Sequence, residues 1–188
     1  LDPKVVHSDL RFYKTPQRRR PSADMLTALK ETFDDCSSAE RKILIKELGL
    51  ISALRHAIIE TRPQAVISFI NLTNVRVLLA TRGLGVPVIV SERVDPHQDP
   101  LPEGATLLRR RLYPMAKYLV AQTAEAADYF ATQMGNRRRA IPNPVLKPEL
   151  PDPGHDASAQ KVGRILVGMG RLAEQKGFGH LLSAFSMV

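Results

Sequence analysis

The residues best suited to chemistry lie near the carboxyl end, in the stretch GMGRLAEQKGFG at 168–179. Gly168 to Ala173 matches the G-x-G-x-x-G/A spacing of dinucleotide-binding loops. Arg171 and Lys176 lie on the same loop, ahead of an apolar helical pattern whose amino terminus favours anions. An arginine fork and a mobile lysine charge suit the two phosphates of a diphosphate. The stretch therefore predicts a phosphate-binding loop, and the alternative is that both cations solvate a surface turn.

The start of the following helix bears on which phosphate compound such a loop would bind. In a dinucleotide site the helix begins inside the glycine fingerprint, so that pyrophosphate meets its first N–H groups. Here Gly177 and Gly179 follow Lys176, and the apolar period begins only at Phe178. The loop is therefore longer than the tight turn of a dinucleotide site. An NAD(P)- or FAD-dependent oxidoreductase stays an alternative.

Polar residues also follow two of the strands expected further upstream. Asn71 follows an apolar run, and Glu92 and Arg93 follow the next one in SERVDPHQDP. Ligands of open parallel sheets bind beyond the carboxyl ends of the strands, so these residues are candidates for substrate contact. The alternatives are helix capping by Asn71 and a local ion pair that fixes the loop after Glu92. Asp95, His97 and Asp99 favour turn and capping roles over a metal site, and we expect no metal.

The elements that must position these residues alternate between strand and helix. A long amphipathic helix from Ala39 closes at Arg62–Pro63. The expected strands are 65–70, 86–92, 118–123 and a short one at 139–145, and a further short strand is expected at 5–10. The expected helices between them are 74–84, 105–117 and 124–134. This order predicts an α/β fold with a Rossmann-like parallel sheet and helices on both faces.

A change of composition divides the chain. Five prolines between Pro142 and Pro153 mark a linker at 142–162, after a first domain at 1–141. The remainder, 163–188, reads as the first strand and first helix of a second Rossmann-like domain, with the strand at 164–170.

Three segments resemble a known family. GMGRLAEQKGFGHLLSAF is similar to the GRL-x-x-Q-K-G segment that opens the second domain of family 4 (group 1) glycosyltransferases. AIPNPV resembles the family's I-P-N-x-V turn, and the stretch that ends in SERVDP resembles its polysaccharide and glycolipid subgroup. The resemblance covers about residues 62–188.

The resemblance implies a GT-B fold, in which the first domain handles the acceptor and the second holds the donor. It implies transfer of a hexosyl or N-acetylhexosaminyl group from a nucleotide-diphosphate-sugar to a glycan or lipid-linked acceptor, with retention of configuration. The nucleotide-sugar is then a substrate, and no cofactor is expected. Gly168, Gly170, Arg171 and Lys176 become the donor diphosphate ligands, and Asn71, Glu92 and Arg93 the acceptor-side candidates. The family's first glycine-rich loop and its E-x7-E element have no counterpart, so we expect a fragment that is inactive alone, with its catalytic residues unidentified.

The charge balance bears on partners. The net charge is +8, and three arginine triplets stand at 18–20, 109–111 and 137–139. Aromatic residues make up only 5%, with no tryptophan, so base stacking and nucleic-acid binding are disfavoured. The apolar and basic helix at 106–119 is typical of a membrane-surface helix, and equally of a core helix with a basic outer side. We expect a cytoplasmic protein, possible docking to an anionic membrane, and, as a third alternative, a non-catalytic module that binds polyanions.

Overall fold

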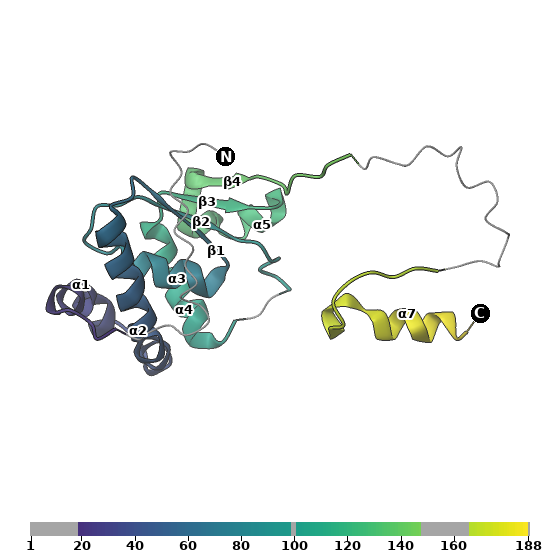
Figure 1. Cartoon of the computed structure of the whole chain (residues 1–188), viewed down its shortest axis with the longest axis horizontal. Coiled ribbons are helices and arrows are strands. Elements are labelled where there is room, and N and C mark those ends of the chain that lie inside the picture. Colours follow the sequence, from purple (N-terminus) through teal and green to yellow (C-terminus); the bar gives the residue numbers. More distant parts are fainter. Residues whose placement is uncertain (1–18, 99–100, 148–165, 188) are drawn as a thin grey trace. The chain divides into compact units, whose positions relative to one another are not determined.

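The chain divides into two compact units, Leu1–Pro144 and Val145–Val188. The computed structural model describes residues 19–98, 101–147 and 166–187 (Figure 1). The strand expected at 5–10 lies outside these residues.

The first unit is built on a sheet of four parallel strands in the order β1-β2-β3-β4. The strands are β1 (Val66–Phe69), β2 (Val88–Ser91), β3 (Tyr118–Ala121) and β4 (Arg138–Ala140). Their register places Ser68 beside Val90 and Val90 beside Leu119. This arrangement confirms the predicted Rossmann-like α/β fold class.

Helices precede the sheet and connect its strands. They are α1 (Ala23–Asp34), α2 (Ser38–Thr61), α3 (Asn71–Ala80), α4 (Glu103–Leu112), η2 (Tyr113–Met115), α5 (Ala124–Asp128), α6 (Ala131–Met134) and η3 (Gly135–Arg137). The long helix predicted from Ala39 to Arg62 is confirmed as α2. Ser37 and Glu40 form a capping box at its start, and Arg62 ends it in the left-handed conformation before Pro63.

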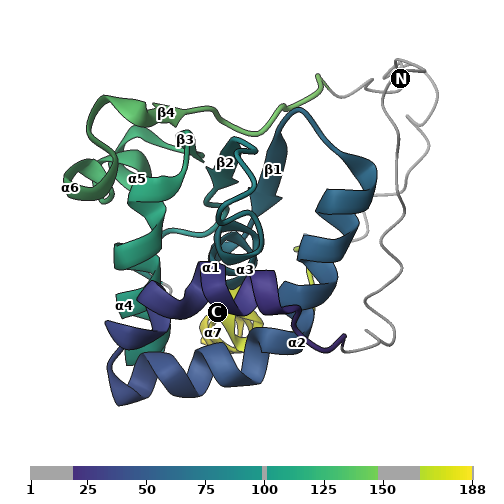
Figure 2. The same ribbon diagram turned by 90° about the vertical axis from the view of Figure 1, so that its left-hand side faces the viewer.

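The core lies on one face of the sheet. Each crossover moves one strand in the same direction, so right-handed connections place the crossing helices on the same side (Figure 2). Val90 and Leu119 point into this side and are fully buried, as are Leu78 of α3 and Leu108 of α4. On the other face the side chains of Ile67, Phe69 and Tyr118 stay 39–60% exposed. Helices were expected on both faces of the sheet, and within the described residues they cover only one.

Some elements differ from the sequence expectation. The helix α1 was not expected in the polar segment after the arginine triplet at 18–20. Ser22 caps its start, and Met25 and Leu29 on one side of the helix are buried. The helix expected at 124–134 is interrupted at Tyr129–Phe130, where the Phe130 ring packs beside Tyr113. Tertiary packing decides that break, and a local pattern carries no signal for it.

The second unit contains η5 (Glu174–Lys176) and α7 (Phe178–Phe185). The late helix start at Phe178 is confirmed. The strand expected at 164–170 is not formed in the part that the structure describes, 166–170, where the backbone is extended and exposed. A strand needs a neighbour for its N–H and C=O groups, and no second strand lies in the described part of this unit.

Candidate functional site

Four polar side chains form a buried network below the carboxyl ends of β1 and β2. Ser68 Oγ donates to Asn74 Oδ1 at 2.7 Å, and Asn74 Nδ2 donates to the Tyr113 hydroxyl at 3.1 Å. Asn74 Nδ2 also lies 3.2 Å from the Ser91 carbonyl oxygen. The Tyr113 hydroxyl donates to Glu92 Oε1. The network therefore joins both strand ends to α3 and to the turn after α4.

Electrostatics fixes the protonation of this network. Asn74 and Tyr113 are fully buried, and Glu92 is 3% exposed. Burial raises the pKa of Tyr113 well above its ordinary value, and the neighbouring Glu92 carboxylate raises it further. Tyr113 thus stays a neutral donor to Glu92 throughout the physiological range.

The turn after β1 is held in an unusual conformation. Ile70 has φ +74°, a value that a β-branched residue rarely adopts, and its N–H donates to the Ser91 carbonyl at 3.0 Å. The strained residue starts α3 directly at Asn71, three residues before the helix start expected from the sequence. Asn71 Oδ1 accepts from the Leu72 N–H at 2.6 Å, but Ile70 occupies the N-cap position and no side chain caps the helix, so the capping role considered for Asn71 is not found.

Arg93 lies at the rim above the network. Its guanidinium donates to Asn143 Oδ1 and lies 5.9 Å from the centre of the Phe69 ring. Asn143 follows β4, so the contact joins the loops after β1, β2 and β4. Within the described residues, Arg93 does not form the Glu–Arg or Arg–Asp ion pair considered from the sequence. The His97 N–H donates to Asp95 Oδ1 at 3.0 Å, which confirms the turn role of Asp95.

The sequence placed Asn71, Glu92 and Arg93 near one another, and the structure brings all three to the same edge of the sheet. It differs in the part played by Glu92, whose buried carboxylate faces Tyr113 rather than solvent. The sequence analysis assigned no site role to Tyr113 or Asn74. Only their position in the fold reveals them, since both come from helical segments.

In the second unit, two glycines lie beneath an aromatic ring. A Cβ atom added to Gly168 would lie 3.0 Å from Phe178 Cε1, and one added to Gly170 would lie 3.4 Å from the same ring. Packing against Phe178 therefore explains both glycines without a ligand. Their role in phosphate approach stays a prediction.

Arg171 and Lys176 flank the η5 turn, and both are exposed. The loop is held by backbone bonds from the Ala173 N–H to the Arg171 carbonyl and from the Lys176 N–H to the Ala173 carbonyl, each 2.9 Å. Neither side chain has an acidic partner within the described residues of the chain. Gly177, at φ +68°, turns the chain into α7 without a side-chain cap, so the first N–H groups of that helix have no such cap.

The comparison with known protein families decides the family. Residues 2–144 match the glycosyl transferase 4-like domain. The chain belongs to this family. No curated protein matches the chain.

The glycosyl transferase 4-like domain contains the whole network at the carboxyl edge of the sheet, from Ser68 to Asn143. Membership supports a transferase that uses a sugar donor and an acceptor. Arg171 and Lys176 lie outside the matched range.

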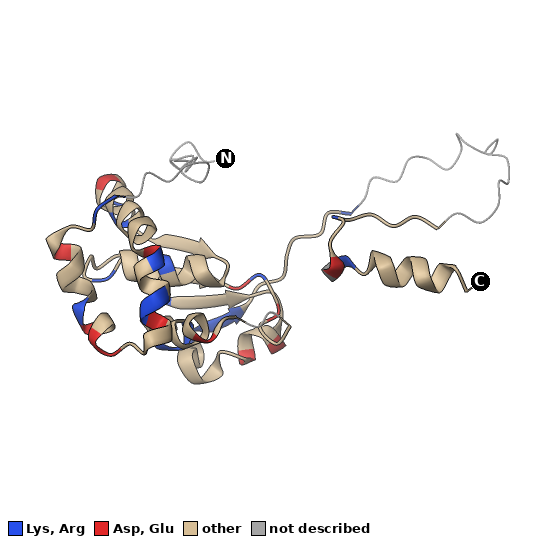
Figure 3. Cartoon of the chain, turned by 90° about the horizontal axis from the view of Figure 1, so that it is seen from below, with Lys and Arg blue, Asp and Glu red and all other residues tan. Residues whose placement is uncertain are grey.

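The arginine triplets of the transferase domain mostly serve its own fold. Arg111 pairs with the buried Glu40 carboxylate at 3.3 Å. Arg137 donates to the carbonyl of Ala116 at 2.6 Å, and Arg138 pairs with Asp128 at 2.8 Å. Figure 3 shows basic and acidic residues interleaved on the helices of this unit. Arg111 and Arg138 are therefore paired with carboxylates, whereas Arg137 is held by backbone carbonyls and Arg109 and Arg110 have no ion pair within the described residues.

The membrane-surface interpretation of the helix at 106–119 is wrong for its apolar side. Leu108, Leu112 and Tyr113 are at most 1% exposed and face the core, so they are not available to lipid. The segment is instead a core helix, α4, that ends at Leu112, and of its three arginines Arg110 and Arg111 are exposed whereas Arg109 is buried. No helix in the described residues is long and apolar enough to cross a bilayer. Those residues also hold no cluster of three metal-ligating side chains of the His, Cys, Asp or Glu type.

Proposed function

We propose that this protein transfers a sugar from a nucleotide-diphosphate-sugar to a glycan or lipid-linked acceptor, with retention of configuration. The observation that carries the proposal is the glycosyl transferase 4-like match over 2–144, around a polar site at the carboxyl edge of its sheet. In this proposal, residues 1–141 bind the acceptor and 163–188 begin the donor-binding domain. The reaction takes place on the cytoplasmic side of a membrane or in the cytoplasm.

The donor side of the proposal rests on Arg171 and Lys176. Both are exposed cations without an acidic partner among the described residues, on a turn that leads into α7. Negative charge develops on the departing nucleoside diphosphate, and positioned cations stabilise it most at that point. Arg171 and Lys176 would supply that charge.

The late start of α7 favours this donor over a dinucleotide. The helix begins at Phe178, ten residues after Gly168, so its N–H groups lie outside the glycine fingerprint. The fingerprint glycines instead pack under Phe178. These observations argue against the NAD(P) or FAD alternative.

On the acceptor side, Asn71 and Arg93 carry polar groups at the carboxyl edge of the sheet. Glu92 is buried beneath them. The Glu92 carboxylate, held by Tyr113, fixes the start of the loop that carries Arg93. Arg93 and Asn71 would then contact acceptor hydroxyl or phosphate groups. Glu92 is a positioning residue in this scheme.

The test is an assay of sugar transfer from a nucleotide-sugar donor by the full-length protein. We expect Arg171→Ala/Lys176→Ala to lower kcat/KM by about 100-fold or more, because two charge-assisted contacts to the leaving group are lost. Lys42→Ala/Lys46→Ala, on exposed positions of α2, is the matched control and should leave the rate unchanged.

Calorimetric titration of the same proteins separates the function classes. UDP or GDP should bind the unmodified protein and fail to bind the Arg171→Ala/Lys176→Ala variant, whereas NAD(P) should bind neither. Saturable NAD(P) binding without nucleoside diphosphate binding would contradict the proposal. A non-catalytic polyanion binder would bind heparin equally well in both variants.

A further inference from the structure

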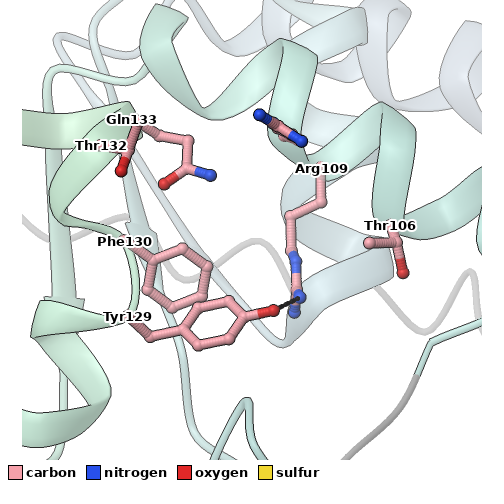
Figure 4. Close-up of a pocket in the computed structure, with 7 residues that line it drawn as sticks. Thr106, Arg109, Tyr129, Phe130, Thr132 and Gln133 are labelled. Atoms are coloured by element: carbon pink, nitrogen blue, oxygen red, sulfur yellow. Dashed lines mark hydrogen bonds between the residues drawn. The ribbon is translucent and has the colours of Figure 1, made fainter.

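Helices α4 and α6, with the Tyr129–Phe130 turn, enclose a pocket of about 310 Å³ (Figure 4). None of its lining residues belongs to the site at the carboxyl edge of the sheet or to the donor loop. Among the residues that the structure describes, the pocket is lined by two arginines, Arg109 and Arg110, and by no acidic side chain. Its volume lies at the lower end of the range of about 300–1,000 Å³ that is usual for small-molecule pockets.

Arg109 is a buried cation without a carboxylate partner. The residue is 5% exposed, and its guanidinium stacks 5.4 Å from the centre of the Tyr129 ring and 5.3 Å from that of Phe130. Its one hydrogen bond goes from Nη2 to the Tyr129 hydroxyl at 3.2 Å. Withdrawing an arginine from water is unfavourable, and cation–π contacts compensate only part of that loss. No acidic side chain within the described residues makes an ion pair with it.

The neighbouring polar groups are also incompletely paired. Arg110 is exposed on the next position of α4 and has no ion-pair partner in the described part of the chain. Gln133 Oε1 is buried without a hydrogen-bond partner, and Figure 4 shows the Gln133 amide across the pocket from Arg109. The NH2 group of this amide, rather than the acceptor oxygen, is the part that can donate to a bound anion.

We propose that this pocket binds a phosphate group, as the monoester of a small molecule or of a lipid headgroup. Guanidinium forks bind phosphate oxygens in pairs, and a dianion matches the two positive charges of Arg109 and Arg110. The Gln133 amide adds one more hydrogen-bonding group from the opposite wall. The two aromatic rings hold the Arg109 plane in place, so little side-chain freedom is lost on binding.

The site is independent of the proposed transfer reaction, and its test excludes the donor loop. The protein carries Arg171→Ala/Lys176→Ala, so that any phosphate bound there no longer contributes. Inorganic phosphate is added at constant ionic strength, and NMR follows the side-chain Nε–H signal of Arg109. We expect a saturable shift of this signal.

The variant Arg110→Gln changes an exposed residue and should leave the fold intact. It should weaken phosphate binding by about tenfold, the effect of one lost charge-assisted contact. Lys42→Gln is the matched control on α2 and should bind as the parent protein does. The absence of a saturable shift, or an equal affinity of the Arg110→Gln variant, would overturn the proposal.

Two further measurements distinguish the source of the phosphate. Glucose 1-phosphate that binds more tightly than inorganic phosphate would identify a soluble monoester. Retention on phosphatidylcholine vesicles containing phosphatidic acid, with weaker retention at the same surface charge from phosphatidylserine, would identify a lipid headgroup. Arg110→Gln should reduce whichever of the two preferences is found.

Discussion

At the residue scale, arginines of similar sequence context serve different purposes. Arg109 is stacked between rings, Arg111 pairs with Glu40, and Arg137 binds backbone carbonyls. The number and clustering of these charges can be seen in the sequence, but their partners cannot, because they come from α2, the Tyr129–Phe130 turn and the turn after α4. The arginine triplets seen in the sequence therefore say less about function than Arg109 does, which has no ion pair within the described residues.

Glu92 illustrates the same limit. Its place after a strand was predictable from the apolar run before it, and so was the nearness of Arg93 and Asn71. The partner of Glu92 was not predictable, because Tyr113 lies 21 positions further along the chain, beyond α4. Pairing across such a distance depends on the packing of α4 on the sheet.

The Tyr113 hydroxyl gives a prediction for alkaline pH. Its folded-state pKa is raised by burial and by Glu92, while in the unfolded chain it titrates near its ordinary value of about 10. Above about pH 10 the unfolded state loses a proton that the folded state keeps, so stability falls as pH rises. Urea unfolding at pH 8 to 11 should show this fall.

Tyr113→Phe is the variant that checks it. The variant should be less stable at pH 8, because Asn74 and Glu92 lose a buried hydrogen-bond partner. Its loss of stability between pH 9.5 and 11 should be smaller than that of the parent protein. An identical slope in both proteins would show that Tyr113 does not carry the effect.

At the element scale, the predictable helices were those with both an apolar periodicity and capping or proline residues at their ends. α2 has its apolar period, its Ser37 cap and Pro63 after its end, and it forms as expected. α3 begins early because Ile70 is held by the Ser91 carbonyl of a neighbouring strand. The segment at 166–170 had the composition of a strand and lacked a neighbour in the described part of its unit. Local sequence patterns thus predicted the central residues of helices and strands, whereas tertiary contacts determine where these elements begin and end.

The contact between α4 and α2 offers a prediction about element packing. A Cβ atom on Gly104 would lie 2.4 Å from the Ala39 carbonyl oxygen, so the start of α4 would have to move away from α2. We expect Gly104→Ala to lower the free energy of unfolding by about 1–3 kcal/mol, a usual effect of overpacking. Urea denaturation followed by circular dichroism measures it.

Gly179→Ala is the matched control. This glycine also lies in a helix, and a Cβ atom there meets nothing within 4 Å. The variant should be neutral or slightly stabilising, because alanine favours helix over glycine. Equal losses in the two variants would mean that the α4–α2 contact is not the cause.

At the scale of the whole molecule, the first unit has its own core and coincides closely with the family match. The unit ends at Pro144, and so does the matched range. A boundary near Pro144 was predictable, because the proline-rich composition around it differs from that of the segments on either side. The alternation of strand and helix predicted a parallel sheet. It predicted neither the order of the strands nor the exposed face that carries Ile67 and Phe69.

The compact first unit predicts that residues 1–144 fold alone. A polypeptide shortened to 1–144 should unfold in urea at the same midpoint as the whole chain, since this unit has its own hydrophobic core. Tyrosine fluorescence is a suitable probe, because all four tyrosines lie before residue 145 and tryptophan is absent. A clearly lower midpoint for the shortened chain would show that the second unit contributes to the same cooperative transition.

The parallel register of β1, β2 and β3 has a consequence for how this domain can change. Each strand ends at the same edge, and the groups that hold the core together precede that edge, while Asn71, Arg93 and Asn143 follow it. Loop segments at this edge can therefore be exchanged between related domains without repacking the hydrophobic interior. Such grafts offer a route to altered specificity on an unchanged scaffold, as long as Tyr113 and Asn74 are kept to anchor the loop bases.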